Sequence, residues 1–315
     1  MFSFLPKIFT TPTPILSCQI QATSLIGRRE ENQDNYLIIN ANNTEKTVAT
    51  WLKNGNPQQA VCSNWPTHLI RVVLMDGMGG HTKGREITEV AALKLSKIPP
   101  CITVNKQQQA LLRLHHVLRN SFTGAKQTRQ PGTSILWAEI DLARCVGTLI
   151  HVGDSRAWLY NNHKWQQLTW DHTALEFDFR DGRIDETSYW QKLKKPQHRI
   201  AQAFGYGSWG VMWQDKDGND IMGLGSGLRL DTEKTLPPYA QDHTDIFNFT
   251  LSPQTSLLLA SDGLWDATQV NLPEPAEITA NTSKKLAQDA IDAGGRDNTS
   301  VVIANFTPRT AEEKM

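Results

Sequence analysis

Short apolar runs bounded by turn residues recur along this chain and predict β-strands as its main elements. The run Val72-Val73-Leu74-Met75 is β-branched at its start and too short to form a helix of its own. It predicts a buried strand that ends directly before Asp76. Other runs of this kind predict strands at 18–26, 36–39, 134–140, 146–152, 157–160, 165–168, 247–249, 256–260 and 301–304.

Apolar residues at near-helical spacing predict only a few helices. Ile87, Val90 and Ala91 indicate an amphipathic helix over 83–98, which Pro99-Pro100 ends. Similar spacing predicts a helix at 105–122, and further helices are expected at 283–293 and, within a less patterned stretch, at 185–193.

Three stretches fit neither pattern. Residues 40–68 are polar and rich in turn residues, and we expect an excursion between strands, such as a longer hairpin. Residues 172–200 have the charged composition of a mobile flap or lid, whereas residues 205–245 are rich in glycine and predict no regular element. We expect residues 1 to about 15 and the tail from Thr307 to be loosely held.

Composition excludes several classes of protein. The 315 residues are 39% hydrophobic and 20% charged, which is ordinary for a globular chain. Lys+Arg and Asp+Glu both number 32, so no basic face for nucleic acid is implied. The four cysteines form no Cys-x-x-Cys pair, which indicates reduced thiols in a cytoplasmic protein. Neither a signal peptide nor a membrane-spanning run of about 20 apolar residues is expected.

Four aspartates stand at the ends of predicted strands, beside or close to glycine. They are Asp76, Asp154, Asp262 and Asp297. One such residue is an ordinary turn signal, but four in one chain predict a converging carboxylate cluster. Several aspartates share a small volume only if a cation offsets their repulsion or if they take up protons.

The donor set and its surroundings favour hard divalent ions over zinc. Carboxylate oxygens suit Mg²⁺ or Mn²⁺, and two such ions roughly 4 Å apart can share a hydroxide suited to attack on phosphorus. Gly77, Gly79 and Gly80 allow positive φ and a close approach to the backbone. Arg29 or Arg28 offers bidentate recognition of a phosphate. The residues thus predict phosphoester hydrolysis, with a metal-dependent nuclease as the alternative.

Six stretches, in this order, resemble the motifs of the metal-dependent Ser/Thr protein phosphatases of type 2C, especially the bacterial branch. The resemblance covers about 18–306 as a catalytic domain, with a flexible arm at 1–17, a polar tail at 307–315, and insertions near 40–68 and 205–245. The matching stretches are Arg29-Glu30-Glu31-Asn32-Gln33-Asp34, Asp76 to Gly84, Gly132-Thr133-Ser134, Val152 to Arg156 with Leu168 to His172, Ser261 to Asp266, and Gly295 to Val301.

The resemblance implies an α+β fold, a four-layer sandwich of two antiparallel β-sheets flanked by α-helices. It implies that Asp76 bridges two metal ions and that the Gly77 carbonyl joins the second. Asp262 and Asp297 would complete the first site. Asp34 would order the water at the metal pair.

The remaining roles follow from the same resemblance. Arg29 would bind the substrate phosphate, and Asp154 and Asp266 match positions that hold a weaker third ion. The implied activity is hydrolysis of phosphoserine and phosphothreonine on proteins by a metal-bridging hydroxide, with Mn²⁺ or Mg²⁺ as cofactor. Phosphoprotein substrates and an opposing Ser/Thr kinase in signal transduction would be its partners. The rival hypothesis is a catalytically weak relative that binds phosphoproteins or regulates a kinase.

Three positions depart from the family pattern. Gln33 replaces a glutamate that is common there, and an amide can still accept a hydrogen bond. Met78 stands where animal members carry a histidine proposed as general acid, which leaves His81 or water for that role. Gln202 replaces the usual arginine.

Overall fold

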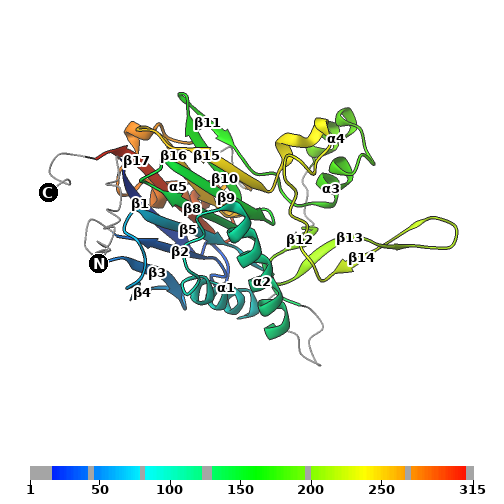
Figure 1. Cartoon of the computed structure of the whole chain (residues 1–315), viewed down its shortest axis with the longest axis horizontal. Coiled ribbons are helices and arrows are strands. Elements are labelled where there is room, and N and C mark those ends of the chain that lie inside the picture. Colours follow the sequence, from blue (N-terminus) through cyan, green and yellow to red (C-terminus); the bar gives the residue numbers. More distant parts are fainter. Residues whose placement is uncertain are drawn as a thin grey trace, which may run out of the picture.

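Two antiparallel β-sheets face each other, and helices cover both outer faces, in the computed structural model of the chain (Figure 1). The structure describes residues 16–41, 46–78, 82–122, 130–195, 200–266 and 271–309. This architecture confirms the predicted four-layer α+β sandwich.

The larger sheet has seven strands and carries the central strand β5. Its order is β15 (Ile246–Thr250), β9 (Val146–Val152), β8 (Ile135–Asp141), β5 (Leu69–Met75), β2 (Asn35–Asn40), β3 (Val48–Lys53) and β4 (Asn56–Val61). The smaller sheet has the order β1 (Leu16–Leu25), β17 (Thr299–Pro308), β16 (Ser256–Ala260), β10 (Arg156–Asn161) and β11 (Lys164–Gln167).

Three helices form the outer layers. α1 (Thr82–Leu95) and α2 (Val104–Phe122) pack on the seven-stranded sheet, and α5 (Thr282–Asp292) packs on β1 and β17 of the other. These are the helices predicted at 83–98, 105–122 and 283–293. No helix among the described residues is both long and apolar enough to cross a bilayer.

Strand β5 shows how the sequence pattern makes this core. All seven of its residues are buried. Because side chains alternate along a strand, Val73 and Met75 pack against the helices, while Val72 and Leu74 face the other sheet. Because both faces of the strand are covered, its second half, 72–75, is a continuous apolar run without polar alternation.

Two further parts lie at one end of the sandwich (Figure 1). A flap consists of α3 (Ala174–Arg180), α4 (Glu186–Leu193) and the 3-10 helix η1 (Pro238–His243), which share a small apolar core. A small sheet of β12 (Gln202–Ala203), β13 (Gly207–Gln214) and β14 (Asp220–Gly225) adjoins it, and its long hairpin projects from the body.

The structure refines the predictions for the irregular stretches. The helix predicted at 185–193 is α4, and the excursion at 40–68 contains the hairpin β3–β4. Helix α3 and the hairpin β13–β14 were not predicted, since both sit in segments without a clear apolar period. Short paired strands β6 (Gly77–Met78) and β7 (Gly132–Thr133), with the 3-10 helices η2 (Asp262–Leu264) and η3 (Pro275–Glu277), complete the described elements.

The boundaries of the arm and tail need correction. Leu16 is buried and, with Ser17, belongs to β1, where the sequence predicted a flexible arm. Strand β17 continues to Pro308 and so includes the start of the predicted tail. The rest of the predicted arm (1–15) and of the tail (310–315) lies outside the described residues.

Candidate active site

Strand pairing brings the predicted carboxylates together at one end of the sandwich. In the seven-stranded sheet, the antiparallel register pairs Asn35 of β2 with Met75 of β5. In an antiparallel pair, the start of one strand lies beside the end of its neighbour. Asp34, directly before β2, therefore lies beside Asp76, directly after β5.

The other sheet contributes from the opposite side. Its register pairs Ala260 of β16 with Val301 of β17. Asp262 opens η2 just beyond β16, and Asp297 lies two residues before β17. Asp154 follows β9 of the larger sheet, so both sheets supply carboxylates to one place.

A cavity of about 530 Å³ collects most of the predicted site residues. It is lined by Asp76, Gly77, Asp154, Asp262, Asp297 and Arg29, among others. An adjoining cavity of about 820 Å³ shares four of these and adds Asp266. Asp34 lies buried close to them, where its Oδ2 accepts a hydrogen bond from the Ser261 hydroxyl at 2.7 Å.

The carboxylates in this cluster resist ionisation. Burial, and then the charge of neighbouring aspartates, raises the pKa of Asp76 and of Asp262 well above its usual range. Burial raises the pKa of Asp34 to about 6, although hydrogen bonds from hydroxyl groups oppose the rise. Burial and the charge of Asp171 raise the pKa of Asp154 to about 7. A divalent cation would relieve this repulsion.

The residues present fit a hard metal ion. Asp34 Oδ1 and Asp262 Oδ1 are buried and have no hydrogen-bond partner among the described residues. Buried polar atoms normally have hydrogen-bond partners, so each of these two oxygens is available to bind a metal ion or a water molecule. The donors are oxygens throughout, which suits Mg²⁺ or Mn²⁺ rather than a softer metal.

Arg29 lies at the rim of the cavity, with its side chain 57% exposed. Its guanidinium forms an ion pair with Asp297 at 2.5 Å. The predicted phosphate-binding arginine thus contacts a predicted metal ligand in this structure. A group that both borders the cluster and reaches solvent is accessible to an incoming phosphate.

Asn298 holds the loop that carries Arg29. Its Oδ1 accepts the Gln33 backbone N–H at 2.9 Å, and its Nδ2 donates to the carbonyls of Ile26 at 2.8 Å and Glu31 at 3.0 Å. No role for Asn298 was predicted from the sequence. Its position directly after Asp297 in a matching stretch was the available signal.

Known proteins are similar to this chain in sequence. No family model matches it. The serine/threonine phosphatase stp of Listeria monocytogenes is 24% identical over 248 residues, which are 74% of this chain and 82% of that protein. The serine/threonine protein phosphatase PstP of Mycobacterium tuberculosis is 26% identical over 251 residues, covering 74% of this chain and 40% of PstP.

Solved structures show the same fold. A serine/threonine phosphatase from S. agalactiae superposes with a TM-score of 0.60 at 19% identity, over 92% of this chain and 99% of that one. The catalytic domain of PstP in complex with two manganese ions superposes with a TM-score of 0.55 at 19% identity, over 93% of this chain and 99% of that one. This chain resembles the bacterial phosphatases of type 2C.

The departures from the type 2C pattern have distinct environments. Gln33 and Met78 line the cavity of about 530 Å³, here called the acidic cavity, whereas Gln202 is buried and lines neither cavity. His81, Gly79 and Gly80 lie outside the described residues. Gly77 is needed for space rather than for positive φ, because a Cβ there would lie 2.3 Å from the Gly84 carbonyl oxygen.

A second group of possible metal ligands consists of His151, His172 and Asp245, whose donor atoms lie within 4.8 Å of one another. The His172 Nδ1 accepts the Gly153 N–H at 3.1 Å, so its Nε2–H donates to Asp245 at 2.8 Å. Arg180 also binds Asp245, at 2.8 Å. A cation would have to displace this buried guanidinium, so the triad fits a structural charge network rather than a metal centre of the type 2C enzymes.

Proposed function

We propose that this chain is a metal-dependent protein serine/threonine phosphatase that hydrolyses phosphoserine and phosphothreonine. The observation that carries the proposal is the convergence of buried, repelling carboxylates from both sheets on one cavity with an arginine at its rim. In this proposal the catalytic domain spans about 18–306, and a divalent pair is held by Asp76, the Gly77 carbonyl, Asp262 and Asp297. Asp154 and Asp266 would hold a third, weaker ion.

Each residue has a defined task in this proposal. The metal pair, when bound, lowers the pKa of a coordinated water so that hydroxide is available near neutral pH. Arg29 binds the phosphate oxygens and places the phosphorus against the cluster. Asp34, fixed by Ser261, offers its free Oδ1 as an acceptor that orients a water in the cavity.

The direct test is hydrolysis of p-nitrophenyl phosphate with added Mn²⁺. We expect turnover in wild type, and at least a hundredfold loss of kcat/KM in Asp262→Asn, because that change removes a charge while keeping the side-chain shape. Circular dichroism would verify folding of both proteins. A folded wild type without Mn²⁺-dependent turnover would favour the binding relative, and cleavage of DNA or RNA with no activity on phosphopeptides would favour a nuclease.

Arg29 allows a more specific prediction. Arg29→Ala should raise KM for a phosphoserine peptide about tenfold, since a charge-assisted contact to the phosphate is lost. Mn²⁺ affinity, measured by calorimetry, should stay nearly unchanged. Arg28→Ala, a neighbouring exposed arginine, serves as the control. Equal loss of metal affinity in Arg29→Ala would contradict a role in phosphate binding.

The setting of this activity is also part of the proposal. An opposing Ser/Thr kinase would supply the phosphoprotein substrates, so the chain would act in signal transduction. All four cysteines are free thiols, which supports a reducing compartment such as the cytoplasm.

A further inference from the structure

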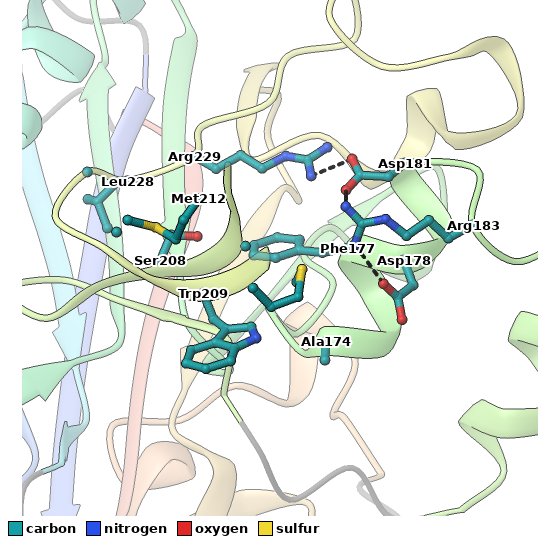
Figure 2. Close-up of a pocket in the computed structure, with 14 residues that line it drawn as sticks. Ala174, Phe177, Asp178, Asp181, Arg183, Ser208, Trp209, Met212, Leu228 and Arg229 are labelled. Carbon is teal, nitrogen blue, oxygen red and sulfur yellow. Dashed lines mark hydrogen bonds and ion pairs between the residues drawn. The ribbon is translucent and has the colours of Figure 1, made fainter. Parts of the chain in front are cut away.

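A second groove lies apart from the acidic cavity, between helix α3 and the hairpin β13–β14 (Figure 2). Its volume is about 700 Å³, and Phe177, Trp209, Met212, Met222 and Leu228 supply its apolar lining. Trp209, Met212 and Met222 are 44%, 45% and 38% exposed. Large apolar side chains gathered on one exposed surface usually mark a site of interaction.

The charged residues along this groove neutralise one another. Arg183 binds Asp178 at 3.0 Å and Asp181 at 3.2 Å, and Arg229 binds Asp181 at 2.7 Å (Figure 2). Arg229 also lies over the Phe177 ring, 5.1 Å from its centroid. Because its charged side chains are paired with one another, the groove favours an apolar group that fits its shape over a charged group.

A single backbone bridge separates the groove from the metal-side cavities. Thr173 and Ile200 form this bridge. Both line the cavity of about 820 Å³, and Ile200 also lines the acidic cavity. The next residue of one segment, Ala174, lines the groove. The next residue of the other, Ala201, accepts the backbone N–H of Trp209 at 2.6 Å, and Trp209 lines the groove as well.

We propose that this groove holds a large apolar side chain of the phosphoprotein substrate, a few residues away from the phosphorylated serine or threonine. The inference rests on the proposed function, and its basis is the adjacency of the groove and the metal-side cavities, which lie on the two sides of the Thr173–Ile200 bridge. An extended chain advances about 3.3 Å per residue, so a segment of about five residues reaches about 16 Å from the phosphorylated residue. Two methionines in the lining adapt to different apolar side chains.

Paired phosphopeptides test the inference. The reference peptide has serine at about five positions on either side of a phosphoserine. Each test peptide has a single leucine in place of one of these serines. We expect wild type with Mn²⁺ to prefer the leucine peptide about tenfold in kcat/KM at one or two neighbouring positions. Trp209→Ser and, separately, Met222→Ser should bring this preference close to one, while turnover of p-nitrophenyl phosphate, which is too small to reach the groove, stays unchanged.

Leu93→Ser on α1 is the matched control, because Leu93 is 43% exposed outside the groove. This variant should keep the full preference. A wild type without preference, or a preference that survives both groove substitutions, would overturn the inference. Concentration-dependent dimers that the same substitutions abolish, without any peptide preference, would overturn it in favour of self-association. Turnover of p-nitrophenyl phosphate by wild type tests the proposed function independently of all these outcomes.

Discussion

Arg71 shows how a single buried charge can be held in the centre of a sheet. It lies within β5 with no exposed surface, and its Nε donates to Glu139 at 2.6 Å. The rest of the guanidinium donates to the carbonyls of Leu95, Ile98 and Pro99, at and just beyond the C-terminal end of α1. One side chain thus satisfies carbonyls that the helix leaves open and fixes α1 on the sheet.

Removing Arg71 should be costly for this reason. Arg71→Leu leaves Glu139 buried without its cation, although burial already raises the Glu139 pKa to about 7. We expect a loss of about 3 kcal/mol in the free energy of unfolding, measured by urea denaturation. The double variant Arg71→Leu/Glu139→Gln should recover part of this loss, because it removes the orphaned charge and keeps an acceptor for Trp137. Equal stability of wild type and Arg71→Leu would contradict the argument.

Among the elements, the flap is held by polar contacts as much as by its apolar core. Glu176 of α3 accepts from Arg180 at 2.6 Å, from His243 of η1 at 2.8 Å and from Tyr189 of α4 at 2.7 Å. Burial alone would raise the Glu176 pKa, but these partners outweigh it and lower the pKa. Arg180 then continues the network to Asp245, next to β15.

Glu176→Leu should therefore loosen the flap selectively. It leaves Arg180 and His243 buried without their shared acceptor, a loss of about 3 kcal/mol by analogy with other broken buried pairs. Hydrogen exchange should show lost protection in α3, α4 and η1, and unchanged protection in β5. Glu186→Leu, on the exposed side of α4, is the control. Uniform loss of protection across the sandwich would show that the flap is not a separate unit.

At the scale of the whole molecule, metal-free stability should depend on pH through the acidic cluster. A carboxylate whose folded pKa exceeds its unfolded value, near 4, binds more protons when folded, so its ionisation destabilises the fold as pH rises. The pKa values of Asp34 and Asp154 are raised to about 6 and about 7, so this loss of stability occurs between about pH 4 and 8. Buried His115 and His151, with lowered pKa, act in the opposite sense at acid pH.

A comparison of variants isolates the carboxylate effect. In EDTA, Asp154→Asn should be more stable than wild type, by about 1 kcal/mol or more at pH 8 and by less at pH 6, because only the ionised aspartate is penalised. Comparison at each pH cancels the histidine contribution. Excess Mn²⁺ should then stabilise wild type more at pH 8 than at pH 6. Thermal unfolding measures both effects, and a stability difference that does not grow with pH would contradict them.

The sequence predicted those parts of the fold in which burial follows a simple period. Strand β5 is buried throughout because both of its faces are covered, and Asp76 is recognisable because it ends the apolar run 72–75. The hairpin β13–β14 gave no such signal, since Trp209 and Met212 face a groove instead of a packed layer. The sequence shows a helical or strand-like spacing of apolar residues only where one side of the element is continuously buried.

Helix α3 was missed for a different reason. It has seven residues and buries Glu176 and Arg180, which resemble a solvated stretch in sequence. The signal available was Thr173 followed by Glu176, a helix-start pattern, and the Thr173 side chain does accept the Glu176 N–H. The direct contact between Arg29 and Asp297 was not predicted either, because the sequence places both residues at one site without showing that their side chains pair.

The division of the carboxylates between two sheets has a consequence for how this chain tolerates change. Asp34, Asp76 and Asp154 adjoin strands of one sheet, and Asp262 and Asp297 adjoin strands of the other. The spacing of these carboxylates, which include the proposed metal ligands, is therefore set by the thickness of the apolar layer between the sheets. A bulkier side chain in that layer would shift one half of the ligand set against the other. Activity in such a protein should therefore fall when the two sheets shift slightly against each other, even where the shift is far too small to unfold the chain.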